Sequence, residues 1–427
     1  MQIIEYPSPN DYNKLLARPV FKQVDLLETV KHIFEKVKQE GDKALIYYSE
    51  KFDRFSPKRI ELSKSELEKI AQKCPQKLKN AIGVAASNVR KFHEAQKLIS
   101  KQIETMPGVV CWQKAVPISK VGLYIPGGTA PLFSTVLMLA IPAKIANCKE
   151  IVLCTPPSKN GLHPAIAFAA LISGVNKVCQ IGGAQAIAAM TYGTESIQKV
   201  NKIFGPGNQY VTAAKQFATI EGLAIDMPAG PSEVLVYMDE TAKPAFVAAD
   251  LLSQAEHGTD SQVILICKEK RLVEKVIYEI QIQLENLPRK KIAKNALENS
   301  KAIIVNSDNE AINLINNYAP EHLILSVKNY NEIEKQIINA GSIFLGNFTP
   351  ESAGDYASGT NHTLPTNGYA KMFSGVSLDS FQKKITVQEI SKQGLQNLGN
   401  VIEIMAEAEN LIAHKNAVSI RLENVKM

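Results

Sequence analysis

The chain changes its pattern of apolar and polar residues near residue 105. Before that point, from about residue 20, apolar positions recur at helical spacing. One predicted helix stops at Gly41, and Ser63 stands where an N-cap would start another. The first 18 residues are polar and contain prolines, so we expect them to form an arm outside the core.

Beyond this region, short runs rich in β-branched residues are separated by helical stretches of roughly ten to fifteen residues. The runs are IVLCTPP, KVCQIGG, KIFGPG, EVLVYM, QVILICK, AIIVNS, HLILSV and SIFLG. Strand and helix alternating this often predict an α/β fold with parallel sheets covered on both faces. Ligands bind such folds at the carboxyl ends of the strands, and we expect the site there.

The C-terminal segment 401–425 begins as an amphipathic helix that should end near Ala413. The alternating run VSIRL after it predicts a strand. In one continuous helix, Glu409 and His414 would diverge by about 140°, so they could not both point at one site. The hydrophobic face of this segment favours docking, and a second subunit is one candidate partner.

Length and composition narrow the class of protein. A chain of 427 residues is too long for one compact core and predicts two large domains with attachments. The net charge of +6 is scattered, so no basic arm for nucleic acid is expected. The most apolar stretch is shorter than a membrane span, and the N-terminus lacks a signal-peptide pattern. Six cysteines without a CxxC pair predict reduced thiols in the cytoplasm.

Three glycine-rich turns point to a nucleotide. They are YIPGGTAPL, IGGAQAI and IFGPGNQY, and none matches the GxGxxG fingerprint of dinucleotide-binding folds. Each places mobile backbone beside a helix N-terminus, which suits a pyrophosphate. A single turn of this kind is more often structural. Three close together, each with a polar or aromatic side chain (Tyr124, Gln185 or Asn208), favour a nucleotide site.

Two short motifs offer metal and proton chemistry. Gln254 and His257 are three residues apart near a helix end, so both face one side and could form half of a metal site. A helix-terminal histidine that binds the last carbonyls is the alternative. Glu321 and His322 lie between Pro320 and a strand, and together they offer a base and a proton carrier. The alternative for them is a polar turn at a strand start.

The stretch 348–366 is a long polar loop after a predicted buried strand. Loops of this length in compact domains are usually functional or disordered, and we favour function for this one, which carries Asp355 and His362. A rival mechanism would use Cys148 or Cys154 as a thiol nucleophile, but both flank an apolar strand and fit buried structural thiols better. A second rival is a metal- and nucleotide-binding protein without turnover.

The segments that carry these residues resemble the characteristic sequence blocks of the histidinol dehydrogenase family, and they occur in the same order. The matching blocks are VGLYIPGGTAPLFSTVLMLAIPA, IGGAQAIAAMTYGTE, IFGPGNQYV, AIDMPAGPSEVLV, DLLSQAEHGTDSQVIL, APEHLIL, FLGNFTPESAGDYASGTNHTLPT and AHKNAVSIRL. They span essentially the whole chain. The resemblance implies an enzyme of histidine biosynthesis that oxidises L-histidinol through L-histidinaldehyde to L-histidine and reduces two NAD.

The resemblance also implies roles for individual residues. Glu321 and His322 match the catalytic pair. The positions that match zinc ligands are Gln254, His257, Asp355 and His414, although manganese or cobalt would suit the same donors. These four and His322 also face the substrate in the family, as do the positions that match Ser232, His362 and Glu409. Tyr124, Gln185 and Asn208 match the NAD contacts.

A homodimer with two Rossmann-like domains is the implied architecture, with small extensions at both ends. We expect residues 1–18 as the arm and 124–233 as an inserted NAD-binding domain. The larger domain, with the metal and catalytic residues, would combine residues 19–123 and 234–376. Residues 377–427 would form an extension that reaches the partner's active site, which is compatible with the divergence of Glu409 and His414.

Overall fold

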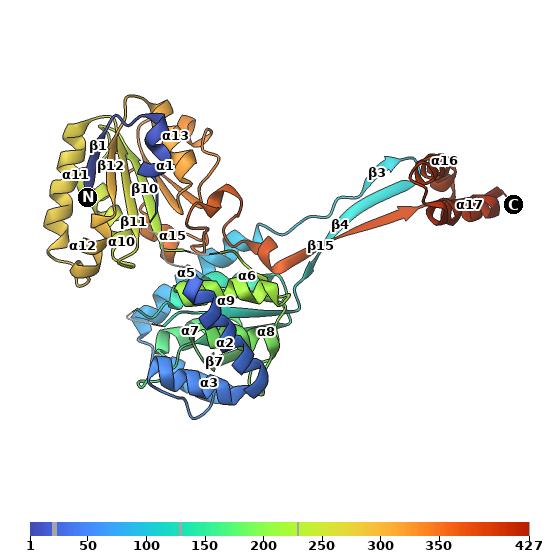
Figure 1. Cartoon of the computed structure of the whole chain (residues 1–427), viewed down its shortest axis with the longest axis horizontal. Helices are drawn as coiled ribbons and strands as arrows, with labels where there is room; N and C mark the ends of the chain where they lie inside the picture. Colours follow the sequence, from blue (N-terminus) through green and yellow to red (C-terminus); the bar gives the residue numbers. More distant parts are fainter. Residues whose placement is uncertain (19–23, 128–129, 229, 427) are drawn as a thin grey trace. The chain divides into compact units, whose positions relative to one another are not determined.

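The computed structural model describes residues 1–18, 24–127, 130–228 and 230–426. Gly128 and Thr129 of the first glycine turn, and the start of the helical region at 19–23, lie outside the described residues. The chain divides into a body, residues 1–95 and 118–381, and an extension, residues 96–117 and 382–427 (Figure 1). The predicted α/β class is confirmed, because the body contains two six-stranded sheets built mainly from parallel pairs.

The first lobe of the body is built on a sheet whose described strand pairs are all parallel. Its strands, in spatial order, are β1 (Gln2–Glu5), β12 (Lys301–Ile304), β11 (Gln262–Cys267), β10 (Glu233–Met238), β13 (His322–Ser326) and β14 (Ser342–Leu345). Its α-helices are α1 (Tyr12–Leu15), α10 (Pro244–Ala255), α11 (Lys270–Leu284), α12 (Lys290–Glu298), α13 (Asp308–Tyr318), α14 (Tyr330–Glu334) and α15 (Glu351–Tyr356). Short 3-10 turns lie at Pro9–Asp11 and Tyr369–Lys371, and a third at Leu378–Phe381 packs in the core of the second lobe.

The central strands of this sheet are buried on both faces, which explains why they are mainly apolar. Along β10, Val234 and Val236 belong to the core shared with α10, α11 and α12. Leu235 and Tyr237 belong to the core on the opposite face, with α1 and α13. Alternate side chains point to opposite faces of a strand, so a strand between two helical layers needs apolar residues at every position.

The second lobe contains the other six-stranded sheet. Its strands, in spatial order, are β2 (Glu61–Leu62), β7 (Lys177–Gln180), β6 (Glu150–Thr155), β5 (Lys120–Tyr124), β8 (Lys202–Phe204) and β9 (Ala224–Ile225). Only the pairing of β2 with β7 is antiparallel among the described pairs. Its helices are α2 (Val24–Glu40), α3 (Asp42–Tyr48), α4 (Lys64–Gln72), α5 (Gln76–Glu94), α6 (Phe133–Ile145), α7 (Pro164–Ser173), α8 (Gly183–Tyr192) and α9 (Gln209–Ile220), with a π-turn at Ser49–Asp53.

The helices before residue 95 pack on this second sheet. Leu67 of α4 and Val89 of α5 share a core with Val121 of β5, and Phe34 of α2 shares the opposite core with Val152 of β6. We had expected residues 19–123 to belong with residues 234–376 in the larger domain. Their amphipathic pattern predicts that they cover a sheet, but it does not say which sheet, because that depends on long-range contacts.

Two local predictions from the sequence agree with this lobe. Helix α2 ends at Glu40, and the next residue, Gly41, has a positive φ of 56°. Ser63 caps α4 in a capping box with Glu66: the Ser63 side chain accepts from the Glu66 N–H, and the Glu66 carboxylate accepts from the Ser63 N–H. No helix in the described part of the chain combines the length and apolar character needed to cross a membrane.

The first 18 residues form part of the first lobe, whereas the sequence predicted an arm outside the core. Strand β1 pairs in parallel with β12 at the edge of the first sheet, and Tyr12 and Leu15 are buried in one of its two cores. An arm outside the core was therefore wrong for these residues. Their few apolar positions are separated by prolines and polar residues, so they show no periodicity in sequence although they meet a ready-made sheet edge.

The extension combines a small antiparallel sheet with two helices. Its strands, in spatial order, are β15 (Gln382–Ile390), β4 (Val109–Pro117) and β3 (Ile103–Met106). The helices α16 (Lys392–Ala408) and α17 (Ile412–Lys426) pack against each other. The strand predicted at VSIRL is wrong, because these residues lie inside α17. Five alternating residues fit a helix face as well as a strand, and packing against α16 selects the helix.

Candidate active site

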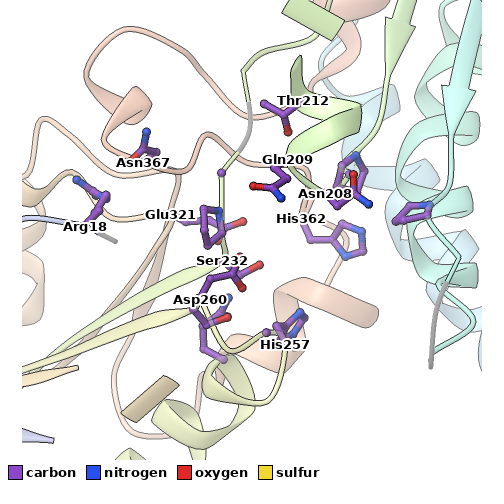
Figure 2. Close-up of a pocket in the computed structure, with 18 of the residues that line it drawn as sticks. Arg18, Asn208, Gln209, Thr212, Ser232, His257, Asp260, Glu321, His362 and Asn367 are labelled. Carbon is purple, nitrogen blue, oxygen red and sulfur yellow. The ribbon is translucent and has the colours of Figure 1, made fainter. Parts of the chain in front are cut away.

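A pocket of about 910 Å³ opens in the body, and both lobes line it (Figure 2). The first lobe contributes residues from the chain before β10, β11 and β13. The second lobe contributes the turn that precedes α9 and the start of α6. Predicted site residues that line the pocket are Asn208, Ser232, Gln254, His257, Glu321, His322, Asp355 and His362.

The two sheets do not present the same edge to this pocket. Asn208 follows β8, so the second lobe uses the carboxyl ends of its strands, as predicted. Ser232 precedes β10, and His322 is the first residue of β13, so the first lobe uses the amino ends. The expectation of carboxyl ends is wrong for the first lobe. Which end of a strand faces the site depends on the tertiary arrangement, and the apolar pattern of the sequence does not reveal it.

The Glu321–His322 pair is buried at the start of β13. Glu321 is 6% exposed and His322 is 3% exposed. The Glu321 Oε2 accepts a hydrogen bond from the Glu233 N–H at 2.8 Å, and His322 Nδ1 lies 3.1 Å from the Glu233 carbonyl oxygen. Because a carbonyl can only accept, Nδ1 must carry the proton. That leaves Nε2 of His322 as the free nitrogen, and it has no hydrogen-bond partner among the described residues.

Burial and charge shift the pKa of both members of the pair. Burial, opposed in part by the nearby imidazole, raises the pKa of Glu321 to about 8. Burial lowers the pKa of His322, but the Glu321 and Asp355 carboxylates outweigh it and raise that pKa to about 10. The Asp355 Oδ1 lies 3.5 Å from His322 Nε2. A cation among these carboxylates would offset their effect and favour the neutral imidazole.

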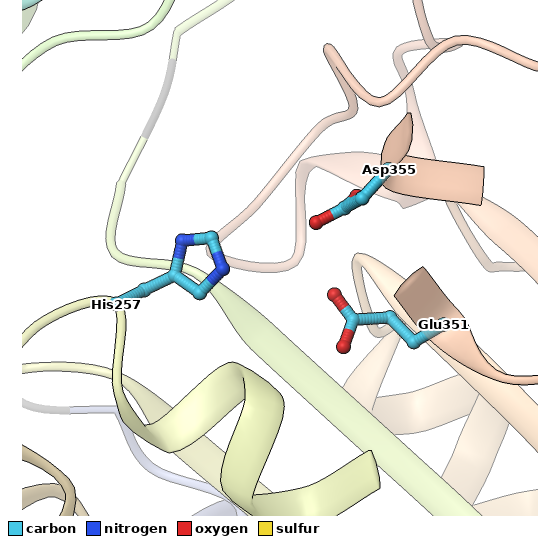
Figure 3. Close-up of side chains that lie close together, drawn as sticks. All are labelled: His257, Glu351 and Asp355. Atoms are coloured by element: carbon cyan, nitrogen blue, oxygen red, sulfur yellow. The ribbon is translucent and has the colours of Figure 1, made fainter. Parts of the chain in front are cut away.

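Three potential metal ligands converge beside the pair. The ligand atoms of His257, Glu351 and Asp355 all lie within 4.8 Å of one another, and Figure 3 shows the imidazole and both carboxylates turned toward a common point. Burial disfavours charge on Asp355, but the imidazoles of His322, His362 and His257 around it lower its pKa to about 2. Burial raises the pKa of Glu351 to about 7. An imidazole and two carboxylates form an N/O donor set that suits zinc or manganese.

Glu351 was not singled out from the sequence, although it is only 1% exposed. It lies on α15, a six-residue helix inside the stretch predicted as a loop, and Asp355 lies four residues later on the same helix. Two acids at this spacing share a helix face, which is the signal that would have found Glu351. Its Oε2 also accepts a 2.5 Å hydrogen bond from the Ser253 hydroxyl.

Gln254, at the end of α10, contacts Glu351 of this group of potential metal ligands. With its amide nitrogen turned to Glu351 Oε1 at 2.7 Å, its oxygen accepts from the Glu233 N–H at 3.2 Å. Gln254 and His257 thus lie near one another, as their spacing predicted, and both line the pocket.

His362 is fixed from two directions. Its Nδ1 lies 2.8 Å from the Asp355 carbonyl oxygen, so by the same argument Nδ1 carries the proton. Its Nε2 accepts from the Thr135 hydroxyl at 3.1 Å. Burial lowers the pKa of His362, which keeps the ring neutral. Thr135, at the start of α6, was not identified from the sequence, because a threonine at a helix start usually acts as a local cap.

The predicted nucleotide residues group around the carboxyl ends of β5, β7 and β8. Asn208 caps α9 by accepting from the Tyr210 and Val211 N–H groups, both at 3.1 Å. Tyr124 is 3% exposed, and its hydroxyl accepts from the Gly183 N–H at 3.0 Å. Gln185 is 1% exposed, and its amide has no partner among the described residues. Of the three, only Asn208 is among the residues that line the pocket.

Glu409 and His414 belong to the extension, which is a separate unit. Helix α16 ends at Ala408, five residues earlier than predicted, and α17 begins at Ile412. Asn410 between them has a left-handed φ of 57°. Glu409 therefore follows the end of α16 as its C-cap and His414 lies on α17, so the divergence expected for one continuous helix does not apply.

The thiol alternative finds no support in the site. Neither Cys148 nor Cys154 lines the pocket, and both are buried. Burial raises the pKa of Cys148 to about 12. The neighbouring Cys179 thiol, together with burial, raises the pKa of Cys154 well above its usual range. Thiols of this kind carry too little thiolate to act as nucleophiles.

Two Rossmann-like sheets, glycine turns at the strand ends of one and a buried acid–histidine cluster at the strand starts of the other define an α/β dehydrogenase. Known proteins agree with this assignment. The sequence pattern described as histidinol dehydrogenase matches residues 16–422. The chain belongs to the histidinol dehydrogenase family.

Individual relatives cover the chain from end to end. Histidinol dehydrogenase of Bacteroides thetaiotaomicron is 59% identical over 427 residues, which is 100% of both chains. Histidinol dehydrogenase of Mannheimia succiniciproducens is 52% identical over 414 residues, 96% of each. The crystal structure of histidinol dehydrogenase from Elizabethkingia anophelis matches with a TM-score of 0.98 and 55% identity, and the match covers 100% of this chain and 99% of that one.

Proposed function

We propose that this chain oxidises L-histidinol through L-histidinaldehyde to L-histidine and reduces two NAD in doing so. Family membership makes it an NAD-dependent enzyme of histidine biosynthesis that acts on the alcohol of histidinol. The observation that supports the particular chemistry is the buried Glu321–His322 pair at the pocket, where His322 Nε2 makes no hydrogen bond and lies 3.5 Å from Asp355 Oδ1. As the cysteine usage predicts, we expect the enzyme to work in the cytoplasm.

When bound, NAD would supply the hydride acceptor and zinc would supply a cationic centre that helps to hold the substrate in place. The protein ligands we propose for zinc are Gln254, His257, Asp355 and, from the extension, His414. The N/O donor set and the acidic surroundings support them, and Glu351 joins them as a neighbouring carboxylate. Manganese or cobalt would suit the same donors.

His322 is the base that we propose for both oxidations. An alcohol carbon releases hydride only as its hydroxyl proton is withdrawn, and Nε2 of His322 is the nitrogen able to take that proton. The Glu233 carbonyl fixes the ring in the required tautomer. With its Nδ1–H committed to the backbone, the ring is held in one orientation while Nε2 gains and loses a proton.

Glu321 is the base that we propose for the step between the two oxidations. The aldehyde must add one water before its carbon can release a second hydride. Glu321 removes a proton from that water, and its raised pKa makes it a stronger base than an exposed carboxylate. The sum of the two steps is one histidinol and one water converted to histidine, with two hydrides leaving.

Residues around the pair would hold the two ligands. We propose that Ser232 and His362 contact the substrate, His362 through a ring already oriented by Asp355 and Thr135. Tyr124, Gln185 and Asn208 would contact NAD, and the unpartnered amide of buried Gln185 supports that role. The second lobe would then bind the dinucleotide at the N-termini of α8 and α9.

The test of this function is the stoichiometry of NADH formation from histidinol. We expect two NADH per histidinol from the zinc-loaded protein, with histidine as the product. The same protein treated with a chelator is the matched control and should form almost none while its circular dichroism stays unchanged. One NADH per histidinol, with aldehyde accumulating, would contradict the four-electron reaction.

We further propose a homodimer in which Glu409 and His414 of each extension complete the partner's site. Two inactive variants test this, His257→Asn in the body and His414→Asn in the extension, unfolded and refolded together. Random pairing makes about half of the dimers mixed, each with one intact site of two, so about a quarter of wild-type activity should return. Each variant refolded alone is the control. A mixture that stays inactive would contradict the exchange.

A further inference from the structure

A single residue, Glu233, holds both members of the catalytic pair through its main chain. Its N–H donates to Glu321 Oε2 at 2.8 Å, and its carbonyl accepts from His322 Nδ1 at 3.1 Å. Glu233 is the first residue of β10, which pairs with β13 so that Val234 lies opposite His322. Any shift of residue 233 therefore displaces the Glu321 carboxylate and the His322 ring together.

The side chain of Glu233 is anchored by Arg18. Glu233 is 2% exposed, and the Arg18 guanidinium donates from Nε to Oε1 and from Nη2 to Oε2, the latter at 2.9 Å. Two parallel hydrogen bonds of this kind fix geometry as well as charge. The Asn367 N–H also donates to Oε1, at 2.9 Å.

Arg18 is in turn held by a residue close to the pair. Its Nη2 donates to the Tyr318 carbonyl at 2.7 Å, and its guanidinium lies over the Tyr318 ring, 4.0 Å from the centroid. Tyr318 ends α13, three residues before Glu321. Arg18 thus joins the two chain segments that carry the catalytic groups, the start of β10 and the turn before β13.

We propose that Arg18 and Glu233 are positioning residues for the catalytic pair. The inference rests on the proposed function, since it assumes that Glu321 and His322 perform proton transfer. The bidentate ion pair prevents rotation of the peptide groups around residue 233, so the tautomer of His322 and the aim of Glu321 are set before substrate binds. Glu233 does not line the pocket, so it acts through these contacts and not on the substrate.

The experiment compares kcat and KM in Glu233→Gln and Arg18→Lys, each normalised to folded protein. Misplacement of a reacting group by about 1 Å costs on the order of a hundredfold in rate. We expect kcat with histidinol to fall roughly ten- to a hundredfold in Glu233→Gln, while KM for histidinol and NAD changes less than about threefold. Arg18→Lys keeps the positive charge but cannot make two parallel hydrogen bonds to Glu233. We therefore expect its kcat to fall less than that of Glu233→Gln.

A control and a second variant keep the test decisive. Lys270→Gln breaks the exposed Lys270–Glu5 pair, which also ties the N-terminal residues to the first lobe, and should leave kcat unchanged. If Glu233→Gln leaves the buried guanidinium unpaired and fails to fold, the double variant Arg18→Gln/Glu233→Gln removes both charges and is expected to show the same kcat loss.

Three results would overturn the inference. In the first, the variants keep wild-type kcat per folded site. In the second, KM for histidinol rises in Arg18→Lys while kcat holds, which would mean that Arg18 binds substrate directly from its place in the pocket wall. In the third, the wild-type protein forms no NADH from histidinol, and only this result would overturn the proposed function as well.

Discussion

The two sheets of the body bring opposite edges to one pocket. In the first lobe the pocket lies at the amino ends of the strands, where α10 and α13 end. In the second lobe the site residues lie at the carboxyl ends, where α8 and α9 begin. A helix carries partial negative charge at its C-terminus and partial positive charge at its N-terminus. The helix ends at the pocket therefore favour a cation at the sheet edge of the first lobe and an anion at the sheet edge of the second.

The side chains at the two edges follow the same division. Glu321, His322, Glu351 and Asp355 make the first lobe's edge rich in buried titratable groups with shifted pKa values. Tyr124, Gln185 and Asn208 at the second lobe's edge are uncharged. We propose that a repeated α/β plan thus serves a metal and proton transfer at one edge and a dinucleotide at the other, according to which ends of its strands face the ligand.

The largest effect should come from the zinc site that we propose in the first lobe. His257→Asn removes an imidazole from the group formed with Glu351 and Asp355, and we expect a loss of activity of about a hundredfold or more. The circular dichroism spectrum should be unchanged, because His257 is exposed at the pocket and supports no core. Steady-state NADH formation measures the loss, and full activity in a protein without zinc would refute the assignment.

The catalytic pair should separate the two oxidations. His322→Asn removes the base used in both, and we expect losses of about 10² to 10⁴ with histidinol and with histidinaldehyde. Glu321→Gln should slow the aldehyde step far more than the alcohol step, since only the aldehyde needs an activated water. Single-turnover NADH formation from each substrate measures this. Equal losses from Glu321→Gln on both substrates would argue against separate roles.

A smaller effect is expected at the second lobe's edge, where Asn208 can be changed in two ways. Asn208→Ala removes the cap from α9 and should cost about 1 kcal/mol of stability. Asn208→Asp keeps the cap and the melting temperature but places a negative charge where we expect the pyrophosphate. KM for NAD should therefore rise more in the aspartate variant, although that variant is the more stable one. The reverse order would place the pyrophosphate elsewhere.

The smallest effect on activity is expected from the buried thiols. Cys148→Ala should leave kcat within about twofold and lower the free energy of unfolding by about 1 kcal/mol, because the thiol lies in the second lobe's core and not at the pocket. Activity assays and thermal unfolding of the same sample measure both quantities. A loss of activity without a loss of stability would revive a thiol mechanism.

Most of the strands could be predicted because their chemistry is local. A strand buried on both faces needs an unbroken apolar run, and β10, β11 and β13 display one. The capped start of α4 is equally local, since Ser63 and Glu66 are three residues apart. The prediction of a strand at VSIRL failed because the helix there depends on a non-local contact, the packing of α17 against α16.

The site was harder to predict than the fold. The proposed ligands and catalytic pair came from the family resemblance, since taken alone each motif had a structural alternative. Glu233 and Glu351 were missed because an acid beside a strand or in a polar loop usually faces solvent, whereas here both are buried and accept hydrogen bonds from Arg18 and Ser253. Their partners are 215 and 98 residues away in sequence, beyond the reach of any local pattern.

The most direct test of the division between the two edges is a paired binding measurement on His257→Asn and Asn208→Asp. Zinc content would be measured by elemental analysis and NAD affinity by calorimetry on the same preparations. We expect His257→Asn to lose most of its zinc yet bind NAD like the wild type. Asn208→Asp should keep its zinc and bind NAD at least about tenfold more weakly, a difference of about 1.4 kcal/mol. If zinc content and NAD affinity fell together in either variant, the two edges would not be separate sites and the account would be contradicted.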